Sequence, residues 1–392
     1  MTPPAAGLDP RWAAVRRLLV VRLDNLGDLL MTTPALAAIR HSLPGVHMTL
    51  LGSPATTAAL AHLPMLDEAI GYDAPWVKGQ AGDDAGPDHR LLLRLGCGRY
   101  DAAIIFTVCT QSALPAAMLC RLAQIPLRLA HSRENPYALL SDWVPDGERV
   151  EQGMRHEVQR QLDLVHSVGM QAADRRLVFH YAAAHMRAAR RRLVAAGCGA
   201  AQPYVVVHVG ATAPSRRYPP ERFATAADAI AAASGHCIVF TGSSAEAPLV
   251  ERARASMRRP SVSLAGQLGL GEFGALLASA RVLVSNNTGP VHMAAALGTP
   301  VAVLYAQTNP KHTPWLTAAR VLYHDVGCRN CLRSVCPEGH NDCLQRVEPA
   351  AVAAAALDLM GLGHAAVQPV QPAQDIAIAP ARAPLSLVGA QA

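Results

Sequence analysis

Residues 18–40 read LLVVRLDNLGDLLMTTPALAAIR. This stretch opens with an apolar run of strand length, Leu18–Leu23, in which Arg22 is the one charged residue. It continues through a turn that contains Gly27 into a segment of helical length. Strands that are apolar on both faces and lead directly into helices are typical of a parallel sheet with helices packed on each side. The beginning of the chain therefore predicts a doubly wound α/β domain.

The same alternation of short apolar runs and helical patterns continues along the chain and restarts after residue 200. Further strands are expected at His47–Leu51, Ala102–Thr107, Arg176–His180, Tyr204–Val209, His236–Thr241, Val262–Ala265, Arg281–Ser285 and Val301–Tyr305. Helices between the later strands are expected at Pro220–Ala233, Ala247–Met257, Leu270–Ala278 and Val291–Leu297. Two such series of β/α units predict an α/β protein with two Rossmann-like, doubly wound domains that face an interdomain cleft.

The expected domain boundaries follow from where the alternation pauses. The first domain covers residues 1–180, a connector with a basic helix covers 181–200, and the second domain covers 201–363. The segment Asp73–Asp88, rich in glycine, aspartate and proline, is expected to be a surface loop. Residues 364–392, rich in alanine, proline and glutamine, are expected to form a disordered tail.

The composition limits the classes of protein to which the chain can belong. Hydrophobic residues make up 51% of the 392 residues and charged residues 16%, which excludes a chain that is disordered throughout. The formal net charge of +6 favours an anionic partner. Only two of the 35 basic residues, Lys78 and Lys311, are lysines. Nine cysteines without an apolar leader segment fit a reducing compartment, so we expect a cytoplasmic protein.

The first chemically unusual turn is Asp24–Asp28. Ligands of doubly wound folds gather at the carboxyl ends of strands, where turns lead into helices. Asp28 stands at the expected start of a helix, on the side of the expected cleft. A carboxylate there can act as the general base for an attacking hydroxyl group. It can equally cap the helix, because aspartate is a leading N-cap residue. Catalysis and capping are therefore alternative roles for Asp28.

Two turns in the second half carry groups that suit phosphate. Thr212, Arg216 and Arg217 lie in a small-residue turn just after the expected strand Tyr204–Val209. The forked donors of arginine match phosphate oxygens, although paired arginines are also common on solvated surfaces. The other turn, Ser285–Met293, opens an apolar helix whose N-terminal N–H groups and dipole attract anions.

Candidate anion ligands in this second turn are Asn287, Thr288, Gly289 and His292. An ordinary cap followed by proline explains Thr288 without any ligand, and a lone helical histidine such as His292 is commonly a core residue. A third turn holds Glu246, which can accept hydrogen bonds from ribose hydroxyls or complement the dipole of its own helix.

By the sequence and the order of these segments, the chain resembles the bacterial ADP-heptose:lipopolysaccharide heptosyltransferases, glycosyltransferase family 9, which have the GT-B fold. The resemblance covers residues 17–360 and rests on Leu19–Arg40, His208–Phe223, Leu264–Gly266, Ser285–Pro300 and Cys328–Cys343, with His156–Val158 as a further family element. It implies an inverting, metal-independent transfer from a nucleoside diphosphate sugar, with no cofactor required.

The resemblance also implies roles for individual residues. It makes Asp28 the general base. The contacts to the nucleotide sugar that it implies are Arg216 at the diphosphate, Thr288, Gly289 and His292 at the phosphates, Glu246 near the ribose and Leu268 near the adenine. Thr212, Arg217 and Asn287 complete the set of candidate nucleotide-sugar contacts.

Two positions depart from the family pattern. Lysine is typical where this chain has Arg216, an exchange that keeps the charge and agrees with the scarcity of lysine, so phosphate binding is expected to survive. Aspartate is usual where this chain has Asn287. The loss of a carboxylate beside a diphosphate removes a like-charge repulsion and can alter the choice of donor.

A cysteine-rich segment offers five metal ligands in a short loop: Cys328, Cys331, Cys336, His340 and Cys343. Their spacing suits a tetrahedral zinc site. Relatives carry a similar segment and are understood to need no metal for catalysis. The resemblance therefore favours a packed, reduced loop near the cleft over a zinc cluster.

We therefore expect an inverting glycosyltransferase that moves a heptose from ADP-heptose to an anionic glycolipid or glycan acceptor of the lipopolysaccharide-core type. Peripheral contact with the inner membrane surface is compatible with the positive charge. One alternative is a GT-B glycosyltransferase for another nucleotide sugar or surface glycan. Another is a non-catalytic nucleotide or nucleic-acid binder with a zinc-type cysteine cluster. No nucleic-acid partner is expected, because the candidate recognition helix, Arg187–Arg192, is typical of a solvated face.

Overall fold

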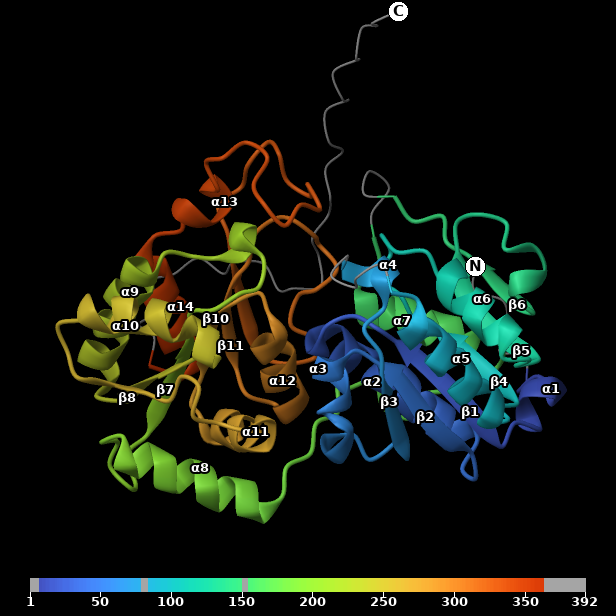
Figure 1. Cartoon of the computed structure of the whole chain (residues 1–392). Helices are drawn as coiled ribbons and strands as arrows, with labels where there is room; N and C mark the ends of the chain where they lie inside the picture. Colours follow the sequence, from blue (N-terminus) through green and yellow to red (C-terminus); the bar gives the residue numbers. More distant parts are fainter. Residues whose placement is uncertain (1–6, 79–83, 150–153, 363–392) are drawn as a thin grey trace, which may run out of the picture.

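The computed structural model describes residues 7–78, 84–149 and 154–362. They form two α/β halves side by side, each built around a six-stranded sheet (Figure 1). The fold class expected from the sequence is therefore confirmed. Within the described ranges, no helix combines the length and the apolar character that a membrane span needs. The expected tail, residues 364–392, lies outside the described residues.

The first sheet pairs its strands in parallel, in the order β3-β2-β1-β4-β5-β6. The apolar run at the start of the chain lies in the middle of this sheet, where Val20 pairs with Leu50 and Ile104. The strands are β1 (Arg17–Arg22), β2 (His47–Gly52), β3 (Glu68–Gly71), β4 (Ala102–Ile105), β5 (Leu127–Ser132) and β6 (Asp142–Pro145). The helices are α1 (Pro10–Ala13), α2 (Leu26–Ser42), α3 (Pro54–Thr57), η1 (Leu60–His62), α4 (Pro75–Lys78), α5 (Gly86–Cys97), α6 (Leu114–Leu122), η2 (Tyr137–Leu139) and α7 (Glu157–His166).

The second sheet repeats this topology, again in parallel, in the order β12-β11-β10-β7-β8-β9. Its strands are β7 (Tyr204–His208), β8 (Cys237–Thr241), β9 (Ser261–Ser263), β10 (Leu283–Asn286), β11 (Val301–Leu304) and β12 (Ala319–Leu322). The helices of this half are α8 (Ala183–Ala195), η4 (Pro214–Arg216), α9 (Pro220–Ser234), η5 (Ser244–Glu246), α10 (Ala247–Ala255), α11 (Leu270–Ser279), α12 (Gly289–Leu297), α13 (Asp342–Gln345) and α14 (Pro349–Leu359). Both sheets have the strand order of dinucleotide-binding folds, which gathers ligands at the carboxyl edge.

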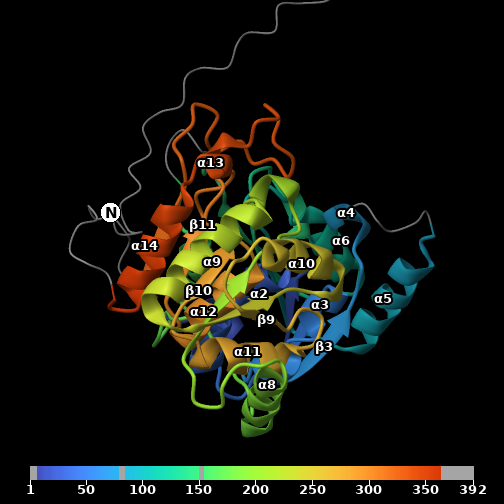
Figure 2. The same ribbon diagram turned by 90° about the vertical axis from the view of Figure 1, so that its left-hand side faces the viewer.

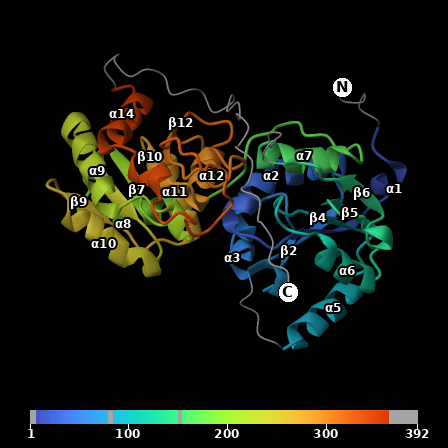
Figure 3. The ribbon, with the colours of Figure 1, turned by 90° about the horizontal axis from the view of Figure 1, so that it is seen from above.

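Alternate residues of β1 pack on opposite helical layers, as the pleat of a strand requires. Leu18 and Val20 belong to the core beneath α2 and α7, whereas Leu19 and Val21 belong to the core beneath α5 and α6. In the second half, α9, α10 and α14 cover one face of the sheet and α11 and α12 the other (Figure 3). The core beneath α2 continues into the core beneath α11 and α12, so the two halves share one apolar cluster. The helix α8 packs against α11 at the lower edge of the molecule (Figure 2).

Three details differ from the expectations. Residues 176–180 form no strand but run as an irregular segment, in which the N–H of Val178 donates to Oγ1 of Thr33. The expected loop Asp73–Asp88 is helical at both ends, in α4 and at the start of α5. The strands β3, β5, β6 and β12 were not expected. The edge strands β3 and β6 are short and only partly buried, so they lack the continuous apolar run that identifies a central strand.

Candidate active site

A cavity of about 820 Å³ lies between the two halves, at the edge where β1, β7, β8 and β10 end. The first half lines it with the beginning of α2 and with Ala55 of α3. The second half lines it with the turns that follow β7, β8 and β10 and with the segment before α11. A cavity of this volume is within the ordinary range for small-molecule sites. The position agrees with the carboxyl-edge site expected for two doubly wound units.

The N-terminal ends of α2 and α12 meet in this cavity. A Cβ atom at Gly27 would lie 3.0 Å from Cδ2 of His292 and 3.4 Å from Cα of Gly289, so this close approach favours glycine. Each helix start presents N–H groups without an intrahelical partner and the positive end of a dipole. The cavity therefore has an electropositive wall formed by both halves.

Asp28 is the third residue of α2 rather than its N-cap, which is Asn25. Its Oδ2 accepts a hydrogen bond from the N–H of Asn25 at 3.2 Å, and its Oδ1 lies 3.7 Å from Nη2 of Arg22. The side chain keeps 12% of its surface exposed and lines the cavity. Asp28 therefore closes a capping box and at the same time presents a carboxylate to the cleft.

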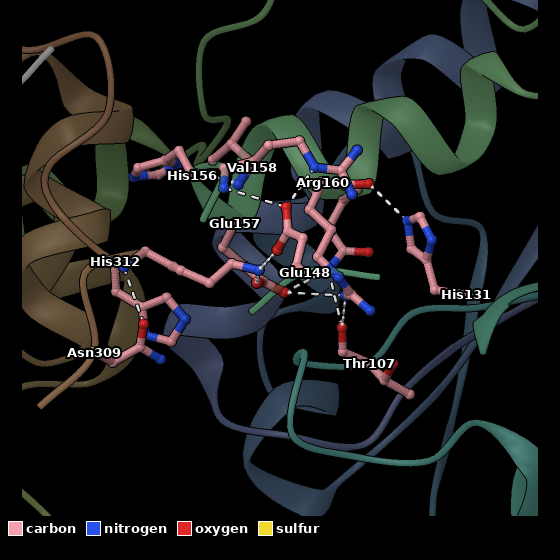
Figure 4. A network of polar contacts seen from close by, with 12 residues as sticks. Thr107, His131, Glu148, His156, Glu157, Val158, Arg160, Asn309 and His312 are labelled. Carbon is pink, nitrogen blue, oxygen red and sulfur yellow. Dashed lines mark hydrogen bonds and ion pairs between the residues drawn. The ribbon is translucent and has the colours of Figure 1, made fainter. Parts of the chain in front are cut away.

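A buried cluster of charges lies behind Asp28. Arg22 is fully buried and approaches Asp24 at 3.2 Å, Asp28 at 3.7 Å and Glu157 at 3.6 Å. Burial raises the pKa of Asp24 to about 6, against the opposing effect of Arg22. Burial also acts to raise the pKa of Glu157, but the cations Arg160 and Arg22 outweigh it and, with a lysine nearby, lower that pKa to about 2. Figure 4 shows Glu157 and Arg160 on the same helix.

The second half brings most of the predicted nucleotide-sugar contacts together. Those that line the cavity are Thr212, Arg216, Glu246, Leu268, Asn287, Thr288, Gly289 and His292. Arg217 does not line it, because its Nε donates to the carbonyl oxygen of Ala211 at 2.8 Å and its side chain is turned to the outside. Of the two neighbouring arginines, Arg216 is thus the one that faces the cavity.

Several nitrogen atoms in the cavity wall are buried without a hydrogen-bond partner in the described part of the chain. They are Nε of Arg216, Nδ1 of His292 and Nε2 of His312. Buried polar atoms are ordinarily paired, and each unpaired one carries a desolvation cost. Such a cluster beside a helix start is typical of a site that awaits an anionic ligand.

Glu246 lines the cavity from the second half. Its Oε2 accepts hydrogen bonds from the N–H of Ser243 at 2.8 Å and from the Ser243 hydroxyl at 2.9 Å, so it caps its own helical turn. A Cβ atom at Gly210 would collide with the Glu246 carboxylate, which explains the glycine there. The carboxylate still lines the cavity, so capping leaves it accessible to a ligand.

The cysteine-rich segment packs behind the Arg216 turn. All nine cysteines are free. The N–H and the hydroxyl of Ser215 donate to the carbonyl oxygens of Ser334 and Arg333, which lie between Cys331 and Cys336. Among the residues that the structure describes, no three His, Cys, Asp or Glu side chains are arranged to hold a metal ion. The described segment therefore supports the turn that carries Arg216.

Sequence reasoning missed several residues of the site. His312 lines the cavity from the loop after β11, where no strand-end motif points to it. Phe273 lines it as well, and its ring centroid lies 6.1 Å from that of His208, the first residue of the family segment His208–Phe223. Arg22 looked like an interruption of a strand, and Glu157 stood out only as part of a family element. The Arg22 and Glu157 side chains are both buried, and this burial, which marks them as part of the site, cannot be seen in the sequence.

The stability of the fold is expected to fall on acidification. Burial lowers the pKa of His131 and of His156 to about 4, so both stay neutral in the fold at pH values where the unfolded chain binds a proton. Unfolding then takes up protons between about pH 6.5 and pH 4. Asp24 acts in the opposite direction, because its pKa of about 6 lets the folded state take up a proton first.

His131 and His156 together outweigh Asp24, and burial lowers the pKa of His292 as well, so the free energy of unfolding should drop by at least about 2 kcal/mol between pH 7 and pH 5. Urea unfolding at pH 7, 6 and 5 measures this change. The variant His156→Gln should have a shallower dependence on pH. A free energy of unfolding that is constant over this range would contradict the expectation.

Comparisons with known proteins agree on one family. The family model for Glycosyltransferase family 9 (heptosyltransferase) matches residues 89–341. The chain is 25% identical over 297 residues to lipopolysaccharide heptosyltransferase 3 of Escherichia coli, covering 74% of this chain and 82% of that protein. Its fold resembles that of a family 9 glycosyl transferase from Veillonella parvula, with a TM-score of 0.75 and 22% identity over 91% of this chain and 99% of that one.

A second solved structure, that of the E. coli ADP-heptose LPS heptosyltransferase II, aligns with a TM-score of 0.68 and 22% identity over 88% of this chain and 98% of that one. These likenesses establish the fold as GT-B. Because the matched residues 89–341 make up more than half of the 392 residues, the chain belongs to glycosyltransferase family 9 and is a glycosyltransferase.

Proposed function

We propose that the protein transfers a heptose from ADP-heptose to an acceptor of the lipopolysaccharide-core type, with Asp28 as the general base. The observation that carries the proposal is the cavity between the halves, in which the Asp28 carboxylate on one side faces the start of α12 on the other. A base on one half and an anion site on the other suit a reaction between an acceptor hydroxyl and a nucleotide sugar.

The second half is proposed to bind the donor. The diphosphate is proposed to lie at the start of α12, against Thr288, Gly289 and His292, with the Arg216 guanidinium on its oxygens. The unpaired nitrogens of Arg216 and His292 support this position, because an anion there would give them partners. Glu246 is proposed to accept hydrogen bonds from the ribose, and Leu268 to contact the adenine.

In the proposed reaction, Asp28 takes the proton of an acceptor hydroxyl while that oxygen attacks the anomeric carbon of the donor. The bond between this carbon and the diphosphate oxygen breaks, and ADP leaves with the electron pair. Attack from the side opposite to the leaving group inverts the configuration. The charge that develops on the diphosphate is stabilised by Arg216 and by the N–H groups of α12, so the proposal requires no cofactor.

The division of labour follows from this arrangement. Residues 1–180 are proposed to bind the acceptor, residues 181–200 to connect the halves, and residues 201–363 to bind the donor. The acceptor is proposed to be an anionic glycolipid or glycan met at the cytoplasmic face of the inner membrane. The formal charge of +6 supports an anionic partner.

The proposal that ADP-heptose is the donor rests on the names of the relatives, among them an ADP-heptose LPS heptosyltransferase. One residue favours a different donor in the same site. Asn287, where the family has aspartate, lies in the cavity wall beside Thr288, and the missing charge can change which sugar is accepted. A GT-B transferase for another nucleotide sugar is therefore the second candidate.

A donor panel tests the proposal. The protein is incubated with ADP-heptose, ADP-glucose, UDP-glucose and GDP-mannose, and thermal stabilisation and release of the nucleoside diphosphate are measured. ADP-heptose is expected to raise the melting temperature and to be turned over fastest, while ADP alone should stabilise without turnover. Preference for another nucleotide sugar would favour the second candidate, and no response to any of the four would overturn both.

A further inference from the structure

Lys311 is a cation of the second half that lies buried in the first. It belongs to the loop after β11, yet its side chain has no exposed surface. Its Nζ is 2.6 Å from Oε2 of Glu148 and 3.5 Å from Oε2 of Glu157, and both glutamates belong to the first half. It is one of only two lysines in a chain that otherwise uses arginine as its cation. A compact ammonium fits between two carboxylates where a planar guanidinium needs more room.

The backbone around Lys311 is fastened to the start of α7. The N–H of Glu157 donates to the carbonyl oxygen of Lys311 at 3.0 Å. Nε2 of His156 lies 2.9 Å from the carbonyl oxygen of Thr313, and the His156 ring packs on that of Trp315 with centroids 4.5 Å apart. Figure 4 shows His156 and Glu157 beside Asn309 and His312 of the second half. The position of Lys311 is therefore determined by contacts from both halves.

From Lys311 a line of alternating charges leads to Asp28. One oxygen of the Glu157 carboxylate faces Lys311, and the other, Oε1, is 3.6 Å from Nη2 of Arg22. The same Nη2 is 3.7 Å from Oδ1 of Asp28. Only Glu157 and Arg22 separate the cation of the second half from the carboxylate in the cleft.

Arg22 is the sensitive member of this line. It is fully buried, and none of its three nitrogens makes a hydrogen bond of ordinary geometry within the described chain, although Nε lies 3.2 Å from Asp24 and Nη2 lies within 3.7 Å of Asp28 and Glu157. Its guanidinium is thus shared among Asp24, Asp28 and Glu157, with Nη2 between the last two. A change in the charge around Glu157 shifts this balance, because buried charges interact over several ångströms with little screening.

We propose that Lys311 is a positioning residue that acts on Asp28 through Glu157 and Arg22. Together with Arg160, which lies 3.7 Å from Oε1 of Glu157, it neutralises Glu157 and so leaves Arg22 available to hold the Asp28 carboxylate at the cleft. It also ties this arrangement to the relative position of the two halves, and hence to the donor site. This inference rests on the proposed role of Asp28 as the base.

The test compares three variants with the wild-type chain. Lys311→Met removes the cation but leaves two buried carboxylates with less compensation, which can prevent folding. The double variant Lys311→Met/Glu148→Gln restores the charge balance and keeps the test valid if the single variant does not fold. Arg155→Met is the matched control, because Arg155 also pairs with Glu148, at 2.5 Å, but belongs to the first half. Within the described part of the chain, Arg155 forms no ion pair with Glu157 or Arg22.

The kinetic readout separates positioning from donor binding. With the donor that is turned over fastest in the panel, the double variant should lose about tenfold in kcat while the donor KM and the Kd for ADP stay within about twofold. The control Arg155→Met should keep kcat within about twofold. Wild-type kcat in the double variant, or an equal loss in the control, would overturn the inference.

A second readout does not depend on the donor. Hydrogen–deuterium exchange of the unliganded proteins should be faster at the N–H of Asn25, which donates to Oδ2 of Asp28, in the double variant than in the wild type and the control, because the Asp28 carboxylate is no longer held in place. If ADP-heptose is not turned over but another donor is, the proposed donor fails and the kinetic test stands. If no donor is turned over, the exchange measurement decides, and an unchanged exchange rate at the N–H of Asn25 overturns the inference.

Discussion

Asp28→Asn is expected to lower kcat by about 10³-fold and to leave the Kd for ADP within about twofold. The amide keeps the shape of the side chain, and its oxygen can still accept the hydrogen bond from the N–H of Asn25 that closes the capping box. What it cannot do is take a proton from an acceptor hydroxyl. The proposed contacts to ADP come from the second half, so nucleotide binding should persist. Steady-state turnover and calorimetric titration with ADP measure the two effects.

The result distinguishes the two roles that the sequence leaves open for Asp28. If the residue only closes the capping box of α2, asparagine should preserve turnover, because its amide oxygen can still accept the hydrogen bond from the N–H of Asn25. A matched control is Asp174→Asn, which removes an exposed carboxylate paired with Arg176 and should change neither kcat nor the Kd. Turnover of Asp28→Asn within about tenfold of the wild type would contradict the assignment of the general base.

The fold could be predicted where the sequence displays continuous apolar runs. Central strands such as β1 and β7 are buried on both faces, so every residue is constrained and the run is visible. The edge strands β3 and β6 have one neighbour each and need no such run. The segment 176–180 has the apolar residues of a strand, but they serve to pack Leu177 and Phe179 into the shared core without any partner strand.

The candidate site was predictable in its turns but not in its supporting charges. The turn that holds Asp28 and the turn that holds Thr288 follow strand ends directly, and the topology alone brings such turns to one edge. The line from Lys311 through Glu157 and Arg22 joins segments that are far apart in the chain. In the sequence Arg22 interrupts an apolar run and Glu157 belongs to a family element, but only burial in the fold brings their charges together with that of Lys311. Composition offered one hint, the rarity of lysine.

The second large effect is expected at Arg216. Arg216→Ala should weaken ADP binding by about 100-fold, because it removes a charge-assisted contact to the diphosphate in a partly buried site. Arg216→Lys, which restores the residue typical of the family, should bind ADP within about tenfold of the wild type, since the ammonium keeps the charge but loses the forked geometry. Calorimetric titration with ADP and with adenosine measures the effect, and adenosine binding should change little in both variants.

The neighbouring Arg217 serves as a control, because it tests whether the loss of ADP affinity depends on the position of the arginine. Its guanidinium is held on the carbonyl oxygen of Ala211, outside the cavity, so Arg217→Ala should cost at most a few-fold in ADP affinity. Arg252→Ala removes an exposed arginine that pairs with Glu221 and should leave the affinity unchanged. Equal losses in the Arg216 and Arg217 variants would mean that the two arginines act through the general field of the turn. A loss confined to Arg216 with adenosine binding intact would locate the diphosphate beside Arg216, in the cavity that the start of α12 also lines.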